Sequence, residues 1–284
     1  MNKASYRLID SGNFRRLDKL GPYYLIRPSL QAVWSPLAPQ SEWKKADAEF
    51  IRGKHGDGSW KLYNKDLPNE WTISASNKLK MIIRLTDFGH LGIFPEHHQN
   101  TDLCDAIANH LKAKPSFKLL NLFAYTGAVS LLGASMGAEV THVDASKTSV
   151  SWARDNGKMH SEELKIRWII EDVKKFIARE VRRKSKYHGI VLDPPSFGRG
   201  TKGEVWKIED DLVPLLNQIQ ELQDEQFSFL QLSAHSPGFT PLALHNLLKP
   251  VCPKNGEIIF SEMSVKAQTG NIELPSGARA VFKS

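Results

Sequence analysis

The spacing of apolar and polar residues changes along the chain, and the change comes near residue 118. Over residues 1–86, short apolar and alternating runs are separated by clusters of turn-forming residues, which is typical of strands. We expect a short helix over Ser41–Phe50 and strands at Tyr23–Arg27, Ala32–Trp34, Trp60–Tyr63, Trp71–Ser74 and Leu79–Leu85. This part therefore predicts a small, strand-rich α+β domain.

From residue 118, continuous apolar runs alternate with segments of helical periodicity. The runs predict strands at Lys118–Phe123, Glu139–Val143, Ile166–Ile170, Gly189–Leu192 and Phe227–Leu232. The segments between and after them predict helices at Thr126–Met136, Lys147–Met159, Val173–Arg183, Asp210–Leu222 and Pro241–Leu248. Such alternation indicates a parallel sheet covered by helices on both faces. Glu257–Val265 and Ala278–Phe282, joined by a turn-rich segment, predict an antiparallel pair at one edge.

Composition narrows the class of protein. The 284 residues are 41% hydrophobic, which is typical of a globular chain, and no apolar run approaches the roughly 20 residues that cross a bilayer. The first ten residues lack the apolar core of a secretory signal, and two cysteines make no disulfide framework. His97 and His98 follow Glu96, but neighbouring side chains point apart on most backbones. We therefore expect a cytoplasmic protein without a membrane segment or a metal.

Basic charge is concentrated at the start of the chain. Residues 1–86 hold 15 basic and 8 acidic residues, whereas residues 87–284 hold 23 of each. The first part also carries Trp34, Trp43, Trp60 and Trp71. Basic charge interleaved with aromatic side chains suits RNA, although the tryptophans could equally form the core of a small domain. We divide the chain into an RNA-binding domain, residues 1–86, and a second domain, residues 87–284.

Polar residues follow four of the expected parallel strands, and ligands of open α/β sheets bind at these carboxyl ends. Asn121–Gly127 leads into a helix, where a glycine lets backbone approach a ligand. Asp144 stands where an acid commonly binds ribose hydroxyls, and Glu171-Asp172 where a carboxylate can accept from an adenine amine. Taken singly, an acid at the end of a strand is more often a turn or helix cap, but four such strand ends in this order favour a shared ligand site. Asp193-Pro-Pro-Ser-Phe197 ends the fourth strand. No G-x-G-x-x-G dinucleotide motif is present.

The runs NLFAYTG, VDAS, EDV and LDPPSF, together with the upstream segment FGHLGIFPE, resemble class I S-adenosylmethionine-dependent methyltransferases. The similarity covers roughly residues 80–284 and is greatest to the large-subunit ribosomal-RNA methyltransferases with a DPP-x-F motif. It implies a Rossmann-like α/β sheet of seven strands with an antiparallel edge hairpin. It also implies that residues 1–80 form the substrate domain that precedes the catalytic domain in this group.

The resemblance further implies S-adenosylmethionine as cofactor and assigns residues to it. The methionine end would lie against Phe94, Pro95 and Glu96. The amino-acid portion would lie on the first loop, through Asn121, Phe123, Ala124, Tyr125, Thr126 and Gly127. The ribose would bind at Asp144, Ala145 and Ser146, and the adenine at Asp172 and Val173, with Asp193 also beside the cofactor.

The nature of the methyl acceptor can be argued from the cysteines. Methylation of a cytosine carbon normally needs a cysteine thiolate, which relatives carry after the fifth strand. Here that place reads Leu232-Ser-Ala-His-Ser-Pro-Gly238, and Cys104 and Cys252 lie elsewhere. A nitrogen acceptor has its own lone pair and needs mainly positioning.

For a nitrogen acceptor, the expected catalytic residues are Asp193, Pro194, Pro195 and Phe197. Asp193 and the Pro194 carbonyl would orient the base, Pro195 would help to stiffen the loop, and Phe197 would stack on the base. His235 could contact the substrate, act as a base or simply pack.

We thus expect methylation of a base nitrogen in RNA of ribosomal type. The alternatives are a cytosine carbon, a protein or a small molecule as acceptor, or a non-catalytic RNA-binding protein that retains the cofactor fold. The oligomeric state is not indicated.

Overall fold

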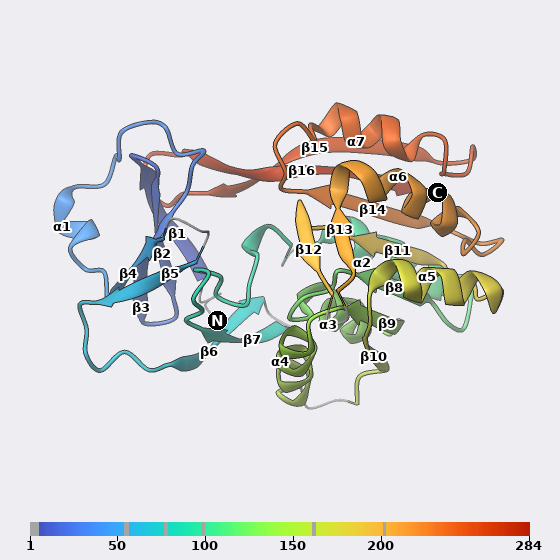
Figure 1. Ribbon diagram of the computed structural model, residues 1–284, viewed down its shortest axis with the longest axis horizontal. Coiled ribbons are helices and arrows are strands. Elements are labelled where there is room, and N and C mark those ends of the chain that lie inside the picture. Colours follow the sequence, from blue (N-terminus) through green and yellow to red (C-terminus); the bar gives the residue numbers. More distant parts are fainter. Residues whose placement is uncertain (1–5, 54–56, 77–78, 98–99, 161–162, 201–202) are drawn as a thin grey trace. The chain divides into compact units, whose positions relative to one another are not determined.

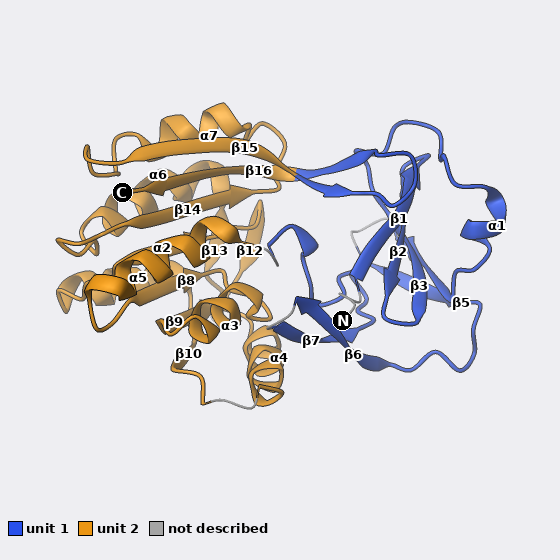
Figure 2. Ribbon diagram, turned by 180° about the vertical axis from the view of Figure 1, so that it is seen from behind, with its two compact units in different colours: residues 1–98, 264–276 blue, residues 99–263, 277–284 orange. Residues whose placement is uncertain are grey.

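The computed structural model describes residues 6–53, 57–76, 79–97, 100–160, 163–200 and 203–284. These residues form two compact units, which Figures 1 and 2 show as ribbons. Unit 1 comprises residues 1–98 and 264–276, and unit 2 comprises residues 99–263 and 277–284. Each unit is described by itself below.

Unit 1 is built on a five-stranded sheet with the order β1-β2-β3-β4-β5. β3 and β4 run parallel, and the other neighbours run antiparallel. A second sheet pairs β6 with β7, and η1 is a 3-10 helix. The bounds are β1 Tyr6–Gly12, β2 Arg15–Leu20, β3 Tyr23–Pro28, α1 Gln40–Trp43, β4 Ala48–Arg52, β5 Gly58–Leu62, β6 Glu70–Ser76, β7 Leu79–Arg84 and η1 Pro95–His97.

The interior of unit 1 holds buried carboxylates among its apolar side chains. Leu17 and Leu20 of β2 are fully buried, but so are Asp10 and Asp18. Asp10 Oδ2 accepts the indole N–H of Trp43 at 3.0 Å and a backbone N–H at 2.8 Å. Buried polar groups with such partners avoid the cost of unsatisfied desolvation.

Two expected elements of this unit were wrong. The helix expected over Ser41–Phe50 is confined to Gln40–Trp43, and Ala48–Arg52 is instead strand β4. The helix ends at Trp43, and the chain then turns toward β4 at Asp47, whose carboxylate accepts the backbone N–H of Tyr24 at 2.7 Å. Ala32–Trp34 is a loop, because its carbonyls accept N–H groups from the β1–β2 turn.

Unit 2 contains a seven-stranded sheet with the order β10-β9-β8-β11-β14-β16-β15. The first five strands run parallel, and β16 pairs antiparallel with β14. The expected sheet with an antiparallel edge hairpin is therefore confirmed. The strands are β8 Lys118–Leu122, β9 Glu139–Asp144, β10 Ile166–Ile170, β11 Gly189–Leu192, β14 Phe229–Ala234, β15 Glu257–Lys266 and β16 Glu273–Lys283.

Helices cover both faces of this sheet (Figure 1). Alternate residues of β8 face opposite sides: Leu119 packs with α2 and α3, and Leu120 with α5, α6 and α7. None of the helices in the described ranges has the length and apolar run that a membrane crossing needs. The helices are α2 Thr101–Ala113, α3 Ala128–Ser135, α4 Lys147–Lys158, α5 Val173–Arg182, α6 Ile208–Gln220 and α7 Pro241–Leu248.

The two units differ in their bounds from the expected division at residue 86. Residues 87–98 and 264–276 both belong with unit 1. The second segment, at the end of the β15–β16 hairpin, adds to the edge of β1: the N–H of Gln268 donates to the Leu8 carbonyl at 2.8 Å. Leu8 also packs with Val265, Ala267 and Leu274 in one apolar cluster.

Candidate active site

The loop after β8 has an unusual backbone. Phe123, Tyr125 and Gly127 have φ angles of 55°, 49° and 89°, in the left-handed region that non-glycine residues rarely adopt. A Cβ on Gly127 would lie 3.1 Å from the Ala153 side chain. Glycine is therefore required there by both φ and interior packing. The loop turns sharply before α3 begins at Ala128, with Ala124 and Thr126 buried between the strained positions.

Asp144 links this loop to the end of β9. Its Oδ2 accepts the backbone N–H of Tyr125 and its Oδ1 that of Ser146, both at 2.8 Å. Burial raises the pKa of Asp144, and the two N–H groups oppose that rise. Ser146 also caps α4, where its hydroxyl accepts the N–H of Ser149. The strand ends that the sequence predicted to share the cofactor, Tyr125 and Asp144, are thus brought into direct contact.

A buried polar chain supports the loop from below. The Asn121 amide donates to Ser130 Oγ, and Ser130 Oγ lies 2.9 Å from His142 Nδ1. The Ser130 hydroxyl can donate to His142 Nδ1 or accept from it, so the direction of this hydrogen bond depends on the tautomer of His142. Burial, followed by the charge of Arg154, lowers the pKa of His142 to about 3. Asn121 lies beneath the loop, and sequence reasoning missed Ser130 and His142 as its partners.

At the end of β10, the acids have structural partners. Glu171 pairs with Arg179 at 2.6 Å. Asp172 caps α5, and its carboxylate accepts the N–H of Lys175 at 3.1 Å. The side chain of Val173 is buried in the core. Only the backbone of Val173 can therefore serve a ligand, while Asp172 remains partly exposed.

Asp193 stands at the end of β11 beside two residues of the next strand's end. The Ser233 hydroxyl donates to its Oδ1 at 2.7 Å, and His235 Nε2 lies 3.4 Å from the same oxygen. Pro194 is buried, whereas Pro195 is exposed. Sequence reasoning left the role of His235 open and did not consider Ser233, which carries no motif of its own.

The chain beyond Pro195 forms a short hairpin that the sequence did not predict. Its strands are β12, Phe197–Arg199, and β13, Val205–Lys207. Trp206 is buried, donates its indole N–H to the Pro195 carbonyl at 2.7 Å and packs on Phe123 at a ring distance of 4.7 Å. The hairpin thereby joins the Asp193 loop to the loop after β8.

Residues 94–96, predicted to line the methionine end of the cofactor, belong to unit 1. Phe94 lies edge-on to His90, at a ring distance of 5.9 Å. Pro95 and Glu96 begin η1. Within the described residues, Oε2 of Glu96 is buried and makes no hydrogen bond. An orphaned carboxylate oxygen of this kind suits a ligand with a hydrogen-bond donor.

The aromatic residues of unit 1 are engaged inside the unit. All four predicted tryptophans donate an indole N–H internally: Trp34 to Ser11, Trp43 to Asp10, Trp60 to Thr86 and Trp71 to Leu20. These tryptophans therefore hold the domain together, in agreement with the second of the two interpretations above.

Some of the basic residues of unit 1 are engaged as well. Arg16 and Arg27 bind the fully buried Asp18 at 2.9 and 2.8 Å. The exposed cations of this unit include Arg7, Arg15, Lys44, Lys45, Arg52, Lys61, Lys65 and Lys80.

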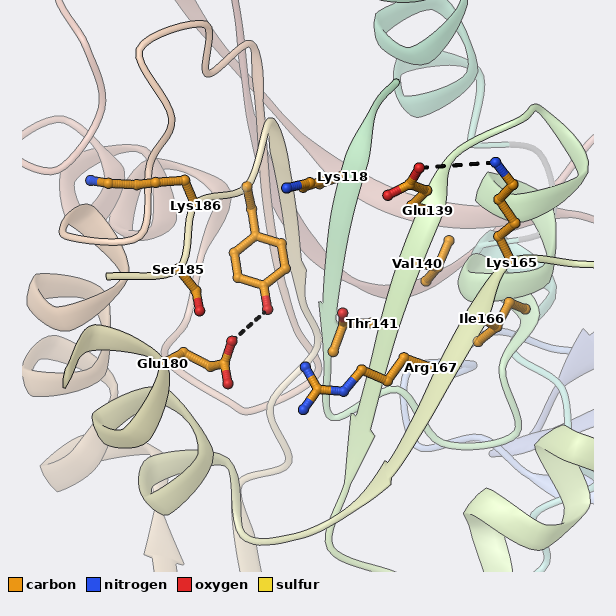
Figure 3. A pocket seen from close by; sticks show the side chains of 11 residues that line it. Lys118, Glu139, Val140, Thr141, Lys165, Ile166, Arg167, Glu180, Ser185 and Lys186 are labelled. Carbon is orange, nitrogen blue, oxygen red and sulfur yellow. Dashed lines mark hydrogen bonds and ion pairs between the residues drawn. The ribbon is translucent and has the colours of Figure 1, made fainter. Parts of the chain in front are cut away.

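Unit 2 also has a pocket of about 560 Å³ at the opposite, amino edge of the sheet (Figure 3). Arg167 and the buried Glu180 point toward the same space there, and Lys165 turns to Glu139 at 3.9 Å. None of the residues predicted for the cofactor or for catalysis is among the described residues that line it. Because ligands of such sheets bind at the carboxyl ends, we do not assign the active site to this pocket.

Comparisons with known proteins agree with the fold and the strand ends. The family described as Conserved hypothetical protein 95 matches residues 102–224. A solved structure, the SAM-dependent methyltransferase from Agrobacterium tumefaciens, is 38% identical with a TM-score of 0.91, over 98% of this chain and 90% of that chain. The sheet order and the strand-end carboxylates define a class I methyltransferase fold. The chain belongs to the S-adenosylmethionine-dependent methyltransferases.

Two curated relatives have names that refer to ribosomal RNA. Ribosomal RNA large subunit methyltransferase K/L of Legionella pneumophila (strain Corby) is 32% identical over 152 residues, 53% of this chain and 20% of that protein. Ribosomal RNA large subunit methyltransferase I of Aeromonas salmonicida (strain A449) is 31% identical over 135 residues, 46% of this chain and 32% of that protein. The chain thus spans between a fifth and a third of their lengths.

The residues present fit the family's cofactor, S-adenosylmethionine. Each oxygen of Asp144 accepts one backbone N–H, which leaves further lone pairs for the two hydroxyls of a ribose. The partly exposed carboxylate of Asp172 can accept from an amine. When bound, the cofactor supplies an activated methyl group on a sulfonium.

Proposed function

We propose that this protein methylates a base nitrogen of RNA, with large-subunit ribosomal RNA as its substrate. The observation that carries the proposal is the arrangement around Asp193. Its carboxylate is held by Ser233 and approached by His235, at the strand end that continues into Pro194 and Pro195. A fixed acceptor of this kind can hold the N–H of a base while the neighbouring nitrogen attacks the methyl group.

The cysteines argue against a covalent route through a cytosine carbon. Both cysteines of the sequence lie away from the end of β14: Cys104 is in α2 and Cys252 follows α7. Burial raises the pKa of the Cys252 thiol to about 12, so that the thiolate is scarce at neutral pH. A nitrogen acceptor needs no such nucleophile.

The names of the two curated relatives favour RNA over a protein or a small metabolite. The basic surface of residues 1–86 favours it too, although the tryptophans and Arg16 are engaged inside the domain. We propose that the exposed cations of this domain bind RNA phosphates, while residues 87–284 bind the cofactor. A polyanion is attracted to such a surface independently of its sequence. We keep the cytoplasm as the expected location.

The proposal is tested by comparing ribosomal RNA from cells with and without the gene. Digestion to nucleosides and mass spectrometry should show one methylated nucleoside with its methyl on a nitrogen, present only when the gene is present. Identical nucleoside profiles would contradict an RNA substrate. Loss of a methyl group on a cytosine carbon would instead restore the covalent alternative.

A further inference from the structure

The β12–β13 hairpin has two faces of different chemistry. Successive residues of a strand point to opposite sides, and the pairing is Phe197 with Lys207, Gly198 with Trp206 and Arg199 with Val205. Trp206 is 4% exposed, on the inner face. Gly198 pairs with Trp206 on this inner face. We call the four residues of the opposite face, Phe197, Arg199, Val205 and Lys207, the outer hairpin face; all four are exposed.

The outer hairpin face combines apolar surface with positive charge. Phe197 and Val205 are 52% and 43% exposed, which is unusual for side chains of this size in a short, anchored element. The Arg199 guanidinium lies over the Phe197 ring, 5.8 Å from its centre. Among the described residues, the side chain of Lys207 forms an ion pair only with Asp210, at 3.9 Å on the surface. Exposed contacts at such distances contribute little free energy, so Arg199 and Lys207 can both turn to a binding partner.

Hydrogen bonds and ion pairs fix the hairpin to helices α5 and α6 of unit 2. Lys174 of α5 donates to the Val205 carbonyl and pairs with Asp211 of α6, each at 2.8 Å. Lys175 pairs with Glu204, and the Lys207 N–H donates to Asp211 at 2.9 Å. With Trp206 in the core, these contacts give the outer hairpin face a defined position. A preorganised surface loses less entropy on binding.

The position of the hairpin, beside the proposed catalytic loop, indicates what kind of molecule binds to it. It begins two residues after Pro195, and Trp206 holds the Pro195 carbonyl, so the outer hairpin face adjoins the proposed catalytic loop. Asp144, Asp172 and Asp193 end three strands at the same carboxyl edge, and their charges repel phosphates. A polyanionic substrate therefore gains from cations next to this edge. Aromatic and apolar side chains interleaved with cations are the chemistry of single-stranded nucleic acid binding.

We infer that the outer hairpin face binds the single-stranded RNA next to the methylated nucleotide. Phe197, which was expected from the sequence to stack on the methylated base, stacks instead on the neighbouring base, which also contacts Val205. Arg199 and Lys207 contact the phosphates on either side. The inference rests on the proposed function and names the part of unit 2 that would bind its substrate. It adds a second RNA contact to the one proposed for residues 1–86.

The test uses the full chain and a fluorescein-labelled single-stranded oligoribonucleotide from large-subunit ribosomal RNA. The double variant Arg199→Gln/Lys207→Gln is compared with Lys158→Gln/Lys165→Gln. The control also removes two charges from exposed side chains of unit 2, since Lys158 pairs with Asp155 at 3.0 Å and Lys165 with Glu139 at 3.9 Å. Fluorescence anisotropy gives the dissociation constant between about 50 and 200 mM KCl. Each lost phosphate contact should lower the log–log salt slope by about 0.7 for a single strand.

The hairpin variant should therefore lose about 1.4 from the slope, while the control keeps the slope of the wild type. Both variants should keep the wild-type melting temperature and S-adenosylmethionine affinity. Phe197→Ala should weaken RNA binding roughly fivefold or more without changing the slope. Equal slopes for the two double variants would overturn the inference and leave the proposed function intact. A wild-type protein that binds no RNA would instead contradict the proposed function, and the inference with it.

Discussion

Asp144 holds the local fold together, and we propose that the same side chain binds the cofactor's ribose. Its two oxygens fix the backbone N–H groups of Tyr125 and Ser146, and so hold the strained loop against the end of β9. The same oxygens have lone pairs left for ribose hydroxyls. The acid was predictable from its place after an apolar strand. The hydrogen bond from the Tyr125 N–H to this acid was not predictable, because it depends on the left-handed backbone at Tyr125.

Replacing Asp144 by Ala should weaken S-adenosylmethionine binding. Loss of a charge-assisted acceptor costs about 1.5–3 kcal/mol, or roughly 10- to 150-fold in the dissociation constant. Isothermal titration measures it, with Thr240→Ala, which removes the capping hydroxyl of α7 and lies outside the predicted cofactor residues, as a control. A folded Asp144→Ala protein with the wild-type dissociation constant would refute the assignment.

His142 should make stability depend on pH. Its pKa is about 3 when folded and about 6.5 when unfolded, so below pH 6.5 the unfolded chain binds a proton that the folded protein does not. The free energy of unfolding should then fall by about 1.4 kcal/mol per pH unit as pH drops from 6.5 toward 3. Urea unfolding of the wild type and His142→Gln should show a shallower fall in the variant. Parallel curves would contradict a neutral, buried His142.

At the scale of elements, the helices and strands of residues 118–265 were predictable to within a few residues, except for the β12–β13 hairpin. The central strands β8, β11 and β14 are buried on both faces and read as continuous apolar runs, as in Leu119–Leu122. The first strands were missed because β1 and β2 bury Asp10 and Asp18, so that hydrophobicity does not alternate. The β12–β13 hairpin was missed because each of its strands has only three residues. The packing of Trp206 in the core of unit 2 holds the hairpin in place.

The elements that carry the cysteines support a prediction on mechanism. Cys104 lies in the first turn of α2, and Cys252 lies in the turn after α7. Replacing both by Ser should leave methyl transfer within about twofold of the wild type, because neither thiol serves as a nucleophile. Turnover is measured with labelled cofactor, and circular dichroism monitors folding. A loss of several orders of magnitude in a folded variant would restore covalent catalysis.

At the scale of the molecule, we propose that the charge difference between the two parts of the chain separates RNA binding from cofactor binding. The sequence predicted the basic first part correctly, but not which cations face solvent. Arg16 was an obvious candidate for RNA binding, yet its guanidinium is bound to the buried Asp18. Arg15, Lys44 and Lys45 are exposed. Only packing, which brings β2 and β3 together around Asp18, distinguishes these cases.

Neutralising Arg15, Lys44 and Lys45 to Gln should lower the salt slope of RNA binding by up to about 2 and leave cofactor affinity unchanged. Arg16→Gln should instead destabilise the fold by about 3–5 kcal/mol, since it leaves a buried carboxylate short of a partner. RNA anisotropy and urea unfolding measure the two effects. A slope that the triple variant does not change would remove residues 1–86 from RNA binding.

The central claim is that Asp193, at the carboxyl end of β11, takes part in methyl transfer from S-adenosylmethionine to a nitrogen of RNA. The most direct measurement incubates the purified protein with methyl-deuterated cofactor and unmodified large-subunit ribosomal RNA, followed by nucleoside mass spectrometry. The account predicts one labelled nucleoside with the deuterated methyl on a base nitrogen, and at least a hundredfold less label with Asp193→Ala. No label in the RNA, label on a carbon, or an Asp193→Ala protein as active as the wild type would contradict it.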